Sequence, residues 1–160
     1  MVSAYKIANE YSDGIELNTI NKNKIYPYSK NGISKLPLFI KPIFNNISPE
    51  KNYLPELKLD LNEHLVENPT STFLIRVTGD SMINAGINPN DTLVVDKEIE
   101  PEHGRIVVAE INNKLLVKRI RYNKDEIYLI SENSKYPIIK VKDEDKFEIW
   151  GVVTSVIRQM

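Results

Sequence analysis

The chain has 160 residues, a formal net charge of −1, no cysteine and only two histidines. This length accommodates one compact domain and one short additional segment. The balanced charge argues against a polyanion-binding surface, so we expect no direct, specific binding of DNA. The lack of cysteine excludes disulfides and a thiol nucleophile, and we expect neither a metal site nor a cofactor.

Residues 1–36 are rich in Asn, Lys, Ser and Tyr and show little periodicity, which predicts a flexible arm. An arm of this length is too short for an independent helix-turn-helix domain. Residues 37–58 are rich in proline and are predicted to form a linker across a surface. No apolar stretch reaches the roughly 20 residues of a membrane helix, and we find no signal-peptide core. We therefore expect a cytoplasmic protein without membrane contact.

Residues 59–160 are predicted to form the folded domain. Its first element is a short helix from Asp60 to Asn68, capped by Asp60 and ended by Pro69. The pattern after it favours strands, with a hairpin turn at Asn112-Asn113, because asparagine tolerates positive φ. About seven strands without long helices between them predict a mostly β fold, a β-sandwich or partly open barrel with short helices. The predicted strands are residues 72–78, 92–96, 105–111, 115–120, 126–130, 138–141 and 147–157.

Two features of this domain suggest a Ser-Lys hydrolase. Ser81 lies in a tight turn of sequence Gly-Asp-Ser-Met, and Lys118 follows 37 residues later in an apolar strand. A serine hydroxyl is a weak nucleophile that needs an adjacent base, and lysine can be that base only when it is neutral. Alternation along the strand places Lys118 between Leu116 and Ile120 on one face, where burial favours the neutral amine. The candidate catalytic residues are therefore Ser81 as nucleophile and Lys118 as general base.

These residues also have purely structural interpretations. Ser81 could cap the short helical turn that follows it. Lys118 could extend its amine from a strand edge into solvent. Asp80, Asp91 and Asp96 could suggest a metal cluster, but acidic residues are common at turns and we expect no metal there.

The two segments and their surroundings resemble the LexA/UmuD-type self-cleaving serine proteases and are most similar to the UmuD branch of that family. The resemblance extends over residues 37–160, about three quarters of the chain. It implies the fold of the family's C-terminal domain, and an oxyanion hole formed by the backbone N–H groups of Asp80 and Ser81. It rests on the order and spacing of residues 77–82, 85–87, 90–91, 93–96, 103–104, 106–107, 117–118 and 150–153.

The resemblance also implies a function. Proteins of the UmuD branch are homodimeric latent proteases of the DNA-damage (SOS) response. The RecA nucleoprotein filament stimulates their self-cleavage, and the trimmed dimer becomes an accessory subunit of an error-prone, Y-family translesion polymerase of the UmuC type. By this resemblance we expect a homodimer, the RecA filament and a UmuC-like polymerase as partners here.

The sequence departs from the family at the bond that is cut. Family members are cut between a small residue and glycine, usually Ala-Gly or Cys-Gly, upstream of the catalytic domain, whereas the spacing from Pro37 to Asp60 places Asn45-Asn46 at that point. Asparagine enters a pocket shaped for alanine only with a desolvation cost for its amide. Two alternatives therefore stay open. One is a non-cleaving, dimerising regulatory module of the same fold, and the other is a phage or plasmid LexA-like regulator that lacks its DNA-binding domain.

Overall fold

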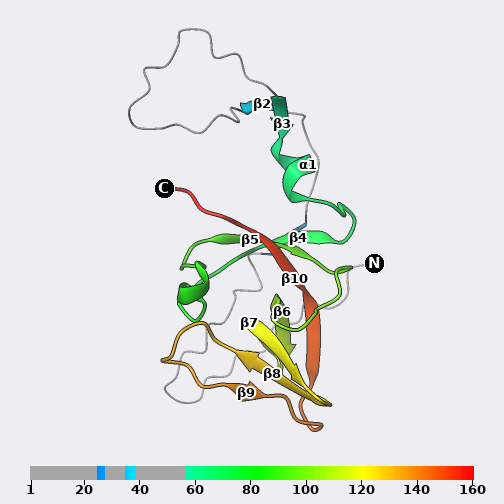
Figure 1. Cartoon of the computed structure of the whole chain (residues 1–160), viewed down its shortest axis with the longest axis vertical. Coiled ribbons are helices and arrows are strands. Elements are labelled where there is room, and N and C mark those ends of the chain that lie inside the picture. Colours follow the sequence, from blue (N-terminus) through cyan, green and yellow to red (C-terminus); the bar gives the residue numbers. More distant parts are fainter. Residues whose placement is uncertain (1–24, 28–34, 39–56) are drawn as a thin grey trace.

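The computed structural model describes residues 25–27, 35–38 and 57–160 (Figure 1). Its strands are β1 (Ile25–Pro27), β2 (Lys35–Leu38), β3 (Leu57–Asp60), β4 (Thr72–Arg76), β5 (Thr92–Asp96), β6 (Ile106–Ile111), β7 (Lys114–Asn123), β8 (Glu126–Ile130), β9 (Ile139–Lys140) and β10 (Phe147–Ile157). An eight-stranded antiparallel sheet has the order β1-β4-β5-β10-β6-β7-β8-β9, and β2 pairs with β3. The order is linear, so the sheet does not close into a barrel. The predicted mostly β fold with short helices is confirmed.

The hairpin between β6 and β7 forms where the sequence predicts it. Asn112 and Asn113 have φ values of 49° and 65°, which asparagine tolerates better than most residues. They connect a register in which Ile111 stands opposite Lys114. β7 continues to Asn123, beyond its predicted end, because its last residues pair with β8.

The long strand β10 connects the two halves of the sheet, as its central course in Figure 1 shows. Its first part pairs with β6 and its second part with β5. The register shifts between Ile149 and Gly151 and again between Val153 and Ser155, which lets the strand bend. Gly151 lies at the first shift, where a Cβ atom would come within 2.6 Å of the Asp96 carbonyl oxygen. The bend therefore requires glycine at this position.

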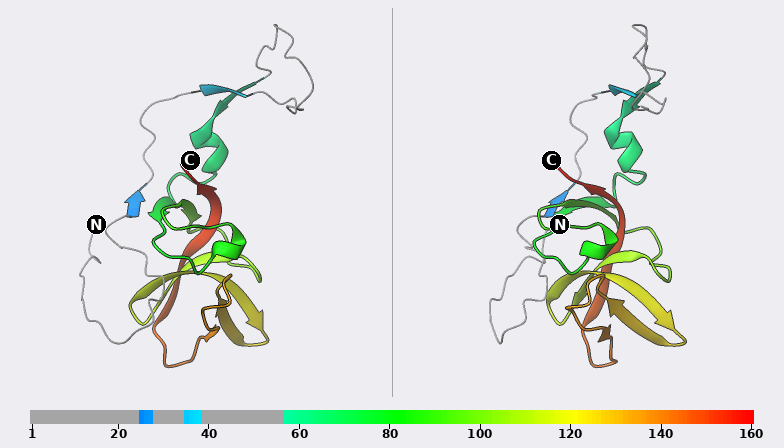
Figure 2. Two further views of the ribbon diagram at one scale, coloured as in Figure 1. Left: turned by 90° about the vertical axis from the view of Figure 1, so that its left-hand side faces the viewer. Right: turned by 60° about the vertical axis from the view of Figure 1, so that its left-hand side comes forward.

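Hydrophobic side chains cover both faces of the sheet near its middle. Along β6, Val108 belongs to one cluster, whereas Val107 and Ala109 belong to another, as the alternation of side chains in a strand demands. Both views of Figure 2 show β10 passing from the region of β4 and β5 to that of β7 and β8. The larger cluster contains Phe73, Ile75, Val77, Met82, Ile87, Leu93, Val95, Val108, Leu115 and Val117.

The helix α1 (Leu61–Leu65) is shorter than predicted. Asp60 caps it as predicted, because its carboxylate accepts a hydrogen bond from the Asn62 N–H at 2.9 Å. The helix ends before Asn68, whose side chain instead donates a hydrogen bond to the Asp96 carboxylate at 2.7 Å. Within the described part of the chain, no helix is long and apolar enough to cross a membrane.

Two short strands lie inside the predicted arm and linker. β1 pairs with β4 so that Tyr26 stands opposite Leu74, and β2 pairs with β3 so that Leu36 stands opposite Leu59. These pairings attach the N-terminal part of the chain to the folded domain at two places. The boundaries proposed for the arm, the linker and the peptidase domain stay a prediction, because most of the first two segments lies outside the described residues.

Candidate active site

Ser81 lies in the turn between β4 and the 3-10 turn η2 (Ile83–Ala85). Met82, beside it, is buried in the larger hydrophobic cluster and anchors this turn to the core. Gly86 ends η2 with a φ of 81°, a conformation that glycine adopts without strain. The turn is therefore fixed at both ends, and Ser81 is held inside it with 1% of its surface exposed.

Lys118 lies in the middle of β7 and is fully buried, with 0% exposure. The pairing of β6 with β7 places it opposite Val107, and residues opposite each other in an antiparallel pair share a face. Ile120, two residues further on, takes the same face. Val107 and Ile120 both belong to the smaller hydrophobic cluster, which also contains Ala109, Leu129 and Val152. The aliphatic stem of Lys118 therefore has apolar surroundings.

The structure brings these two residues together. Lys118 Nζ lies 2.8 Å from Ser81 Oγ, which is hydrogen-bond distance. Burial disfavours the ammonium form and lowers the pKa of Lys118 from 10.5 to about 8. At pH 7 a pKa of about 8 leaves about a tenth of the amine neutral, against about 0.03% for a pKa of 10.5. The arrangement thus supplies a hydroxyl and a base that can accept its proton.

The purely structural interpretations of Ser81 and Lys118 do not fit this geometry. The N-cap residue of η2 is Met82 rather than Ser81, and no side-chain hydrogen bond caps that turn. The amine of Lys118 is buried and does not extend into solvent. No ion pair within the described part of the chain involves Lys118. A buried amine without an ion-pair partner is costly, and such groups cluster at functional sites.

The backbone around Ser81 bears on the expected oxyanion hole. Within the described part of the chain, no hydrogen bond uses the Ser81 N–H. The Asp80 N–H is close to its own carboxylate and helps to hold the pKa of that carboxyl down, after the larger effect of the Tyr136 hydroxyl. The Ser81 N–H is thus the more available of the two donors. The assignment of both to an oxyanion hole stays a prediction.

Sequence reasoning missed a loop, residues 131–138 between β8 and β9, that contacts the Ser81 turn. The Asn133 amide donates hydrogen bonds to the Asp80 carbonyl oxygen at 3.0 Å and to its carboxylate at 3.3 Å. The Tyr136 hydroxyl donates to the same carboxylate, and the Tyr136 ring centre lies 5.4 Å from Lys118 Nζ. Polar residues after an apolar strand are an ordinary loop pattern, so the single sequence carries no signal for these contacts.

The acidic residues considered as metal ligands have other partners. Asp91 is buried and forms an ion pair with Arg158 at 2.6 Å. Asp96, on β5, accepts a hydrogen bond from the Ser71 hydroxyl at 2.7 Å. Asp80 is engaged by the loop described above. Among the residues that the structure describes, no three potential metal ligands gather at one place.

The predicted scissile bond, Asn45-Asn46, lies outside the described residues and stays a prediction. The two strands that flank this part of the chain are described. Leu38 at the end of β2 stands opposite Leu57 at the start of β3. The two described residues that flank the segment, Leu38 and Leu57, therefore lie next to each other.

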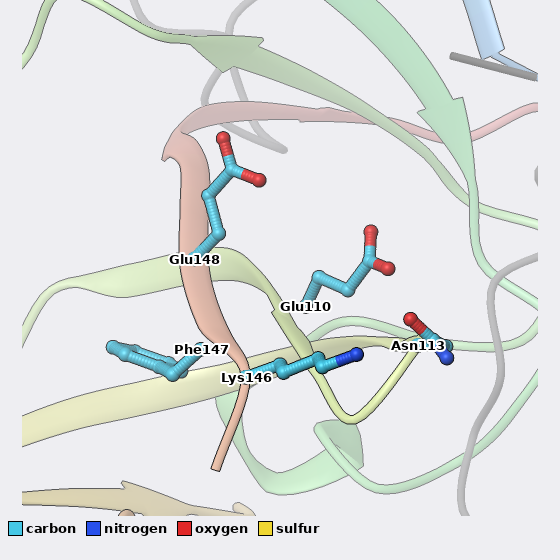
Figure 3. Close-up of a pocket in the computed structure, with 5 residues that line it drawn as sticks. All are labelled: Glu110, Asn113, Lys146, Phe147 and Glu148. Atoms are coloured by element: carbon cyan, nitrogen blue, oxygen red, sulfur yellow. The ribbon is translucent and has the colours of Figure 1, made fainter. Parts of the chain in front are cut away.

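A surface hollow lies where the β6–β7 turn meets the start of β10 (Figure 3). Neither Ser81 nor Lys118 lines it, and it offers no hydroxyl or thiol nucleophile. Its lining residues are Glu110, Asn113, Lys146, Phe147 and Glu148. This hollow therefore lacks the nucleophile that hydrolysis by a Ser-Lys pair requires.

The fold is thus an open antiparallel sheet, and its candidate site is a serine hydroxyl buried against a lysine amine. The family model described as Peptidase S24-like matches residues 45–154. The chain is 35% identical to protein MucA of Salmonella typhimurium, over 82% of this chain and 92% of MucA. It is 38% identical to protein SamA of Salmonella typhimurium strain LT2, over 70% of this chain and 76% of SamA.

A third relative is the LexA repressor of Syntrophotalea carbinolica, which is 40% identical over 74% of this chain and 54% of the repressor. The chain belongs to the Peptidase S24-like family of LexA/UmuD-type self-cleaving serine proteases and is close to its UmuD branch. The resemblance drawn from the sequence is thus confirmed.

Proposed function

We propose that this protein is a UmuD-like latent protease that cuts its own chain with a Ser81–Lys118 dyad. The observation that carries the proposal is the 2.8 Å contact between Ser81 Oγ and the buried Lys118 Nζ. Membership in a family of self-cleaving serine proteases supports it independently. The lowered pKa of Lys118, caused by burial, supports its role as the base.

The proposed reaction begins when the neutral amine of Lys118 takes the proton of the Ser81 hydroxyl as Oγ attacks the scissile carbonyl carbon. The oxyanion of the tetrahedral intermediate accepts hydrogen bonds from the backbone N–H groups of Ser81 and Asp80. The Lys118 ammonium then gives its proton to the leaving nitrogen, and the C–N bond breaks to leave an acyl ester on Ser81. Water, deprotonated by Lys118, hydrolyses this ester and restores the free hydroxyl.

The proposed substrate is the linker at residues 37–58, with the cut at Asn45-Asn46. A tethered substrate has a high effective concentration, which compensates for a weak nucleophile. The pairing of β2 with β3 supports this proposal, because it holds both ends of the segment next to each other. The cut breaks the covalent link to the N-terminal part, and release of that part would then change the surface that the domain offers to partners.

The wider role we propose is in SOS mutagenesis, and it follows from the closeness to the UmuD branch. In this role the RecA nucleoprotein filament stimulates the cut in the cytoplasm. The trimmed homodimer then acts as accessory subunit of a UmuC-like, Y-family translesion polymerase. Binding of the purified, trimmed dimer to such a polymerase tests this part separately from the chemistry.

A second candidate function is a non-cleaving, dimerising regulatory module of the same fold. The observation that favours it is the absence of an Ala-Gly or Cys-Gly pair from the linker, since the Ala-Gly of this sequence is Ala85-Gly86. Ala85 belongs to η2 inside the folded domain, so this pair is no substitute for a linker site. A module of this kind would keep the fold and dimer contacts without hydrolysis.

The experiment that separates the two functions is intact-mass measurement of the purified protein, incubated at alkaline pH and, in parallel, at neutral pH with RecA filaments on single-stranded DNA. We expect two products in both cases. Ser81→Ala and Lys118→Ala should give none while keeping the wild-type circular dichroism spectrum. Cleavage of Lys118→Ala at the wild-type rate would exclude the dyad. An intact wild-type protein under both conditions would favour the non-cleaving module.

A further inference from the structure

The Asp80 carbonyl group and the Ser81 N–H belong to the same peptide unit. This unit is planar and trans, so its C=O and N–H bonds point in opposite directions. Whatever holds the Asp80 carbonyl oxygen therefore also sets the direction of the Ser81 N–H. That N–H is the more available of the two donors expected at the oxyanion hole.

The Asp80 carbonyl oxygen accepts two hydrogen bonds of different kinds. The N–H of Ile83 donates to it at 3.2 Å, but Ile83 belongs to the same turn and moves with it. The amide of Asn133 donates to it at 3.0 Å from a separate loop. Asn133 is 8% exposed, and its own side-chain oxygen accepts a hydrogen bond from the Lys135 N–H at 3.1 Å. Asn133 is therefore an anchor that is itself fixed.

Tyr136 holds the same residue by its side chain. Its hydroxyl donates a hydrogen bond to the Asp80 carboxylate, and its N–H donates to the Asn133 carbonyl oxygen at 3.1 Å. The Glu132 carbonyl oxygen accepts from the Asn84 N–H at 2.9 Å, so the loop also contacts η2. In Figure 1 the orange loop after β8 runs toward the green helical turn that follows Ser81. The loop and the turn thus form one hydrogen-bonded unit.

We propose that Asn133 and Tyr136 are positioning residues for the self-cleavage reaction, which fix the Asp80–Ser81 peptide so that its N–H faces the oxyanion. This inference rests on the proposed function. In this role both side chains act through Asp80, Asn133 by its amide and Tyr136 by its hydroxyl. Loss of an oxyanion-hole donor typically slows hydrolysis by about 10²–10³-fold. Loosening the donor rather than deleting it should cost roughly ten- to a hundredfold.

The test is the pH dependence of the self-cleavage rate of Asn133→Ala and Tyr136→Phe. Both variants keep Lys118 in place, and Tyr136→Phe keeps the aromatic ring that lies near its amine. We expect the maximal rate at alkaline pH to fall roughly ten- to a hundredfold, with an unchanged midpoint of the pH profile. Tyr128→Phe is the matched control, because Tyr128 also donates its hydroxyl to a carboxylate, that of Glu126 at 2.6 Å. It should cleave at the wild-type rate.

The result that would overturn the proposal is a wild-type maximal rate in both variants. A fall in rate accompanied by a shifted midpoint would overturn it as well, because the loop would then act by burying Lys118. Thermal unfolding of each variant identifies any that fails to fold. Tyr136→Phe is the milder change, and its self-cleavage rate alone tests the proposal if Asn133→Ala unfolds.

A second measurement does not depend on cleavage at all. In the wild type the Ser81 amide should have an NMR order parameter in the rigid range of about 0.85, and in Asn133→Ala it should fall below about 0.6. An unchanged order parameter would contradict the anchoring role. If the wild type does not cleave itself, the proposed function fails, and this comparison still decides whether Asn133 positions the turn.

Discussion

Replacing Lys118 by methionine should stabilise the fold, although it removes the proposed base. The comparison is best made in a Ser81→Ala background. That background prevents self-cleavage during the measurement and leaves no hydroxyl to lose its hydrogen-bond partner. Methionine has a similar length and no charge, so the change chiefly removes a buried amine.

The size of the effect follows from the pKa of Lys118, which burial lowers from 10.5 to about 8. The folded state therefore binds the lysine proton less tightly than the unfolded state does. Below about pH 8 the penalty for burying the ammonium is fully present, and it disappears as pH rises through 10.5. At 1.36 kcal/mol per pKa unit, the penalty is about 3 kcal/mol at pH 7 and about 1 kcal/mol at pH 10. Lys118→Met should recover these amounts.

Urea unfolding at both pH values, followed by circular dichroism, measures this difference. Lys114→Met in the same background is the matched control, because Lys114 is an exposed lysine on the same strand. It should change the free energy of unfolding by less than about 0.5 kcal/mol. A Lys118→Met gain that is absent, or equal at pH 7 and pH 10, would refute the lowered pKa.

Three further outcomes follow from the structure. Gly151→Ala should lower the free energy of unfolding by about 1–3 kcal/mol, because its Cβ would press on the Asp96 carbonyl oxygen; a change below about 0.5 kcal/mol in urea unfolding would contradict this packing. Replacing Asn45-Asn46 by Ala-Gly should accelerate self-cleavage and give a product that begins at residue 46, as N-terminal sequencing checks; an unchanged rate or another terminus would relocate the cut. After cleavage, the N-terminal piece should co-elute with the domain in native buffer and separate only in denaturant, because β1 pairs with β4 and β2 with β3. Separate elution in native buffer would show that these pairings do not hold it.

The parts of the fold that depend on local chemistry could be predicted from the sequence. β5, β8 and β10 have the predicted bounds, because apolar runs and turn residues delimit them. Asn112-Asn113 forms the predicted turn for the same local reason. β1 could not be predicted, since Ile25 becomes part of a strand only by pairing with Ile75. The predicted helix at Asp60 is too long, because Asn68 at its predicted end makes hydrogen bonds with Asp96 of β5 and with Thr72 at the start of β4, which no helical pattern reveals.

The candidate site likewise contains residues that the sequence indicates and residues that only the fold brings together. Ser81 and Lys118 could be found because a tight turn and an apolar strand each carry a recognisable pattern, and the structure places them in contact. Asn133 and Tyr136 could not be found. They reach Asp80 across 53 and 56 residues of sequence, and only the folded sheet brings them there.

The central claim is that a neutral Lys118 activates Ser81, and the pH profile of self-cleavage tests it most directly. Intact mass would give first-order rates for the wild type from pH 6 to pH 10, with Ser81→Ala as the inactive control. With a pKa of about 8, the rate should rise about tenfold from pH 7 to pH 9 and then level off. A lysine with its ordinary pKa of 10.5 would give a rise of about a hundredfold without a plateau. A rate that is constant or falls over this range in the folded protein, or cleavage of Ser81→Ala, would contradict the dyad.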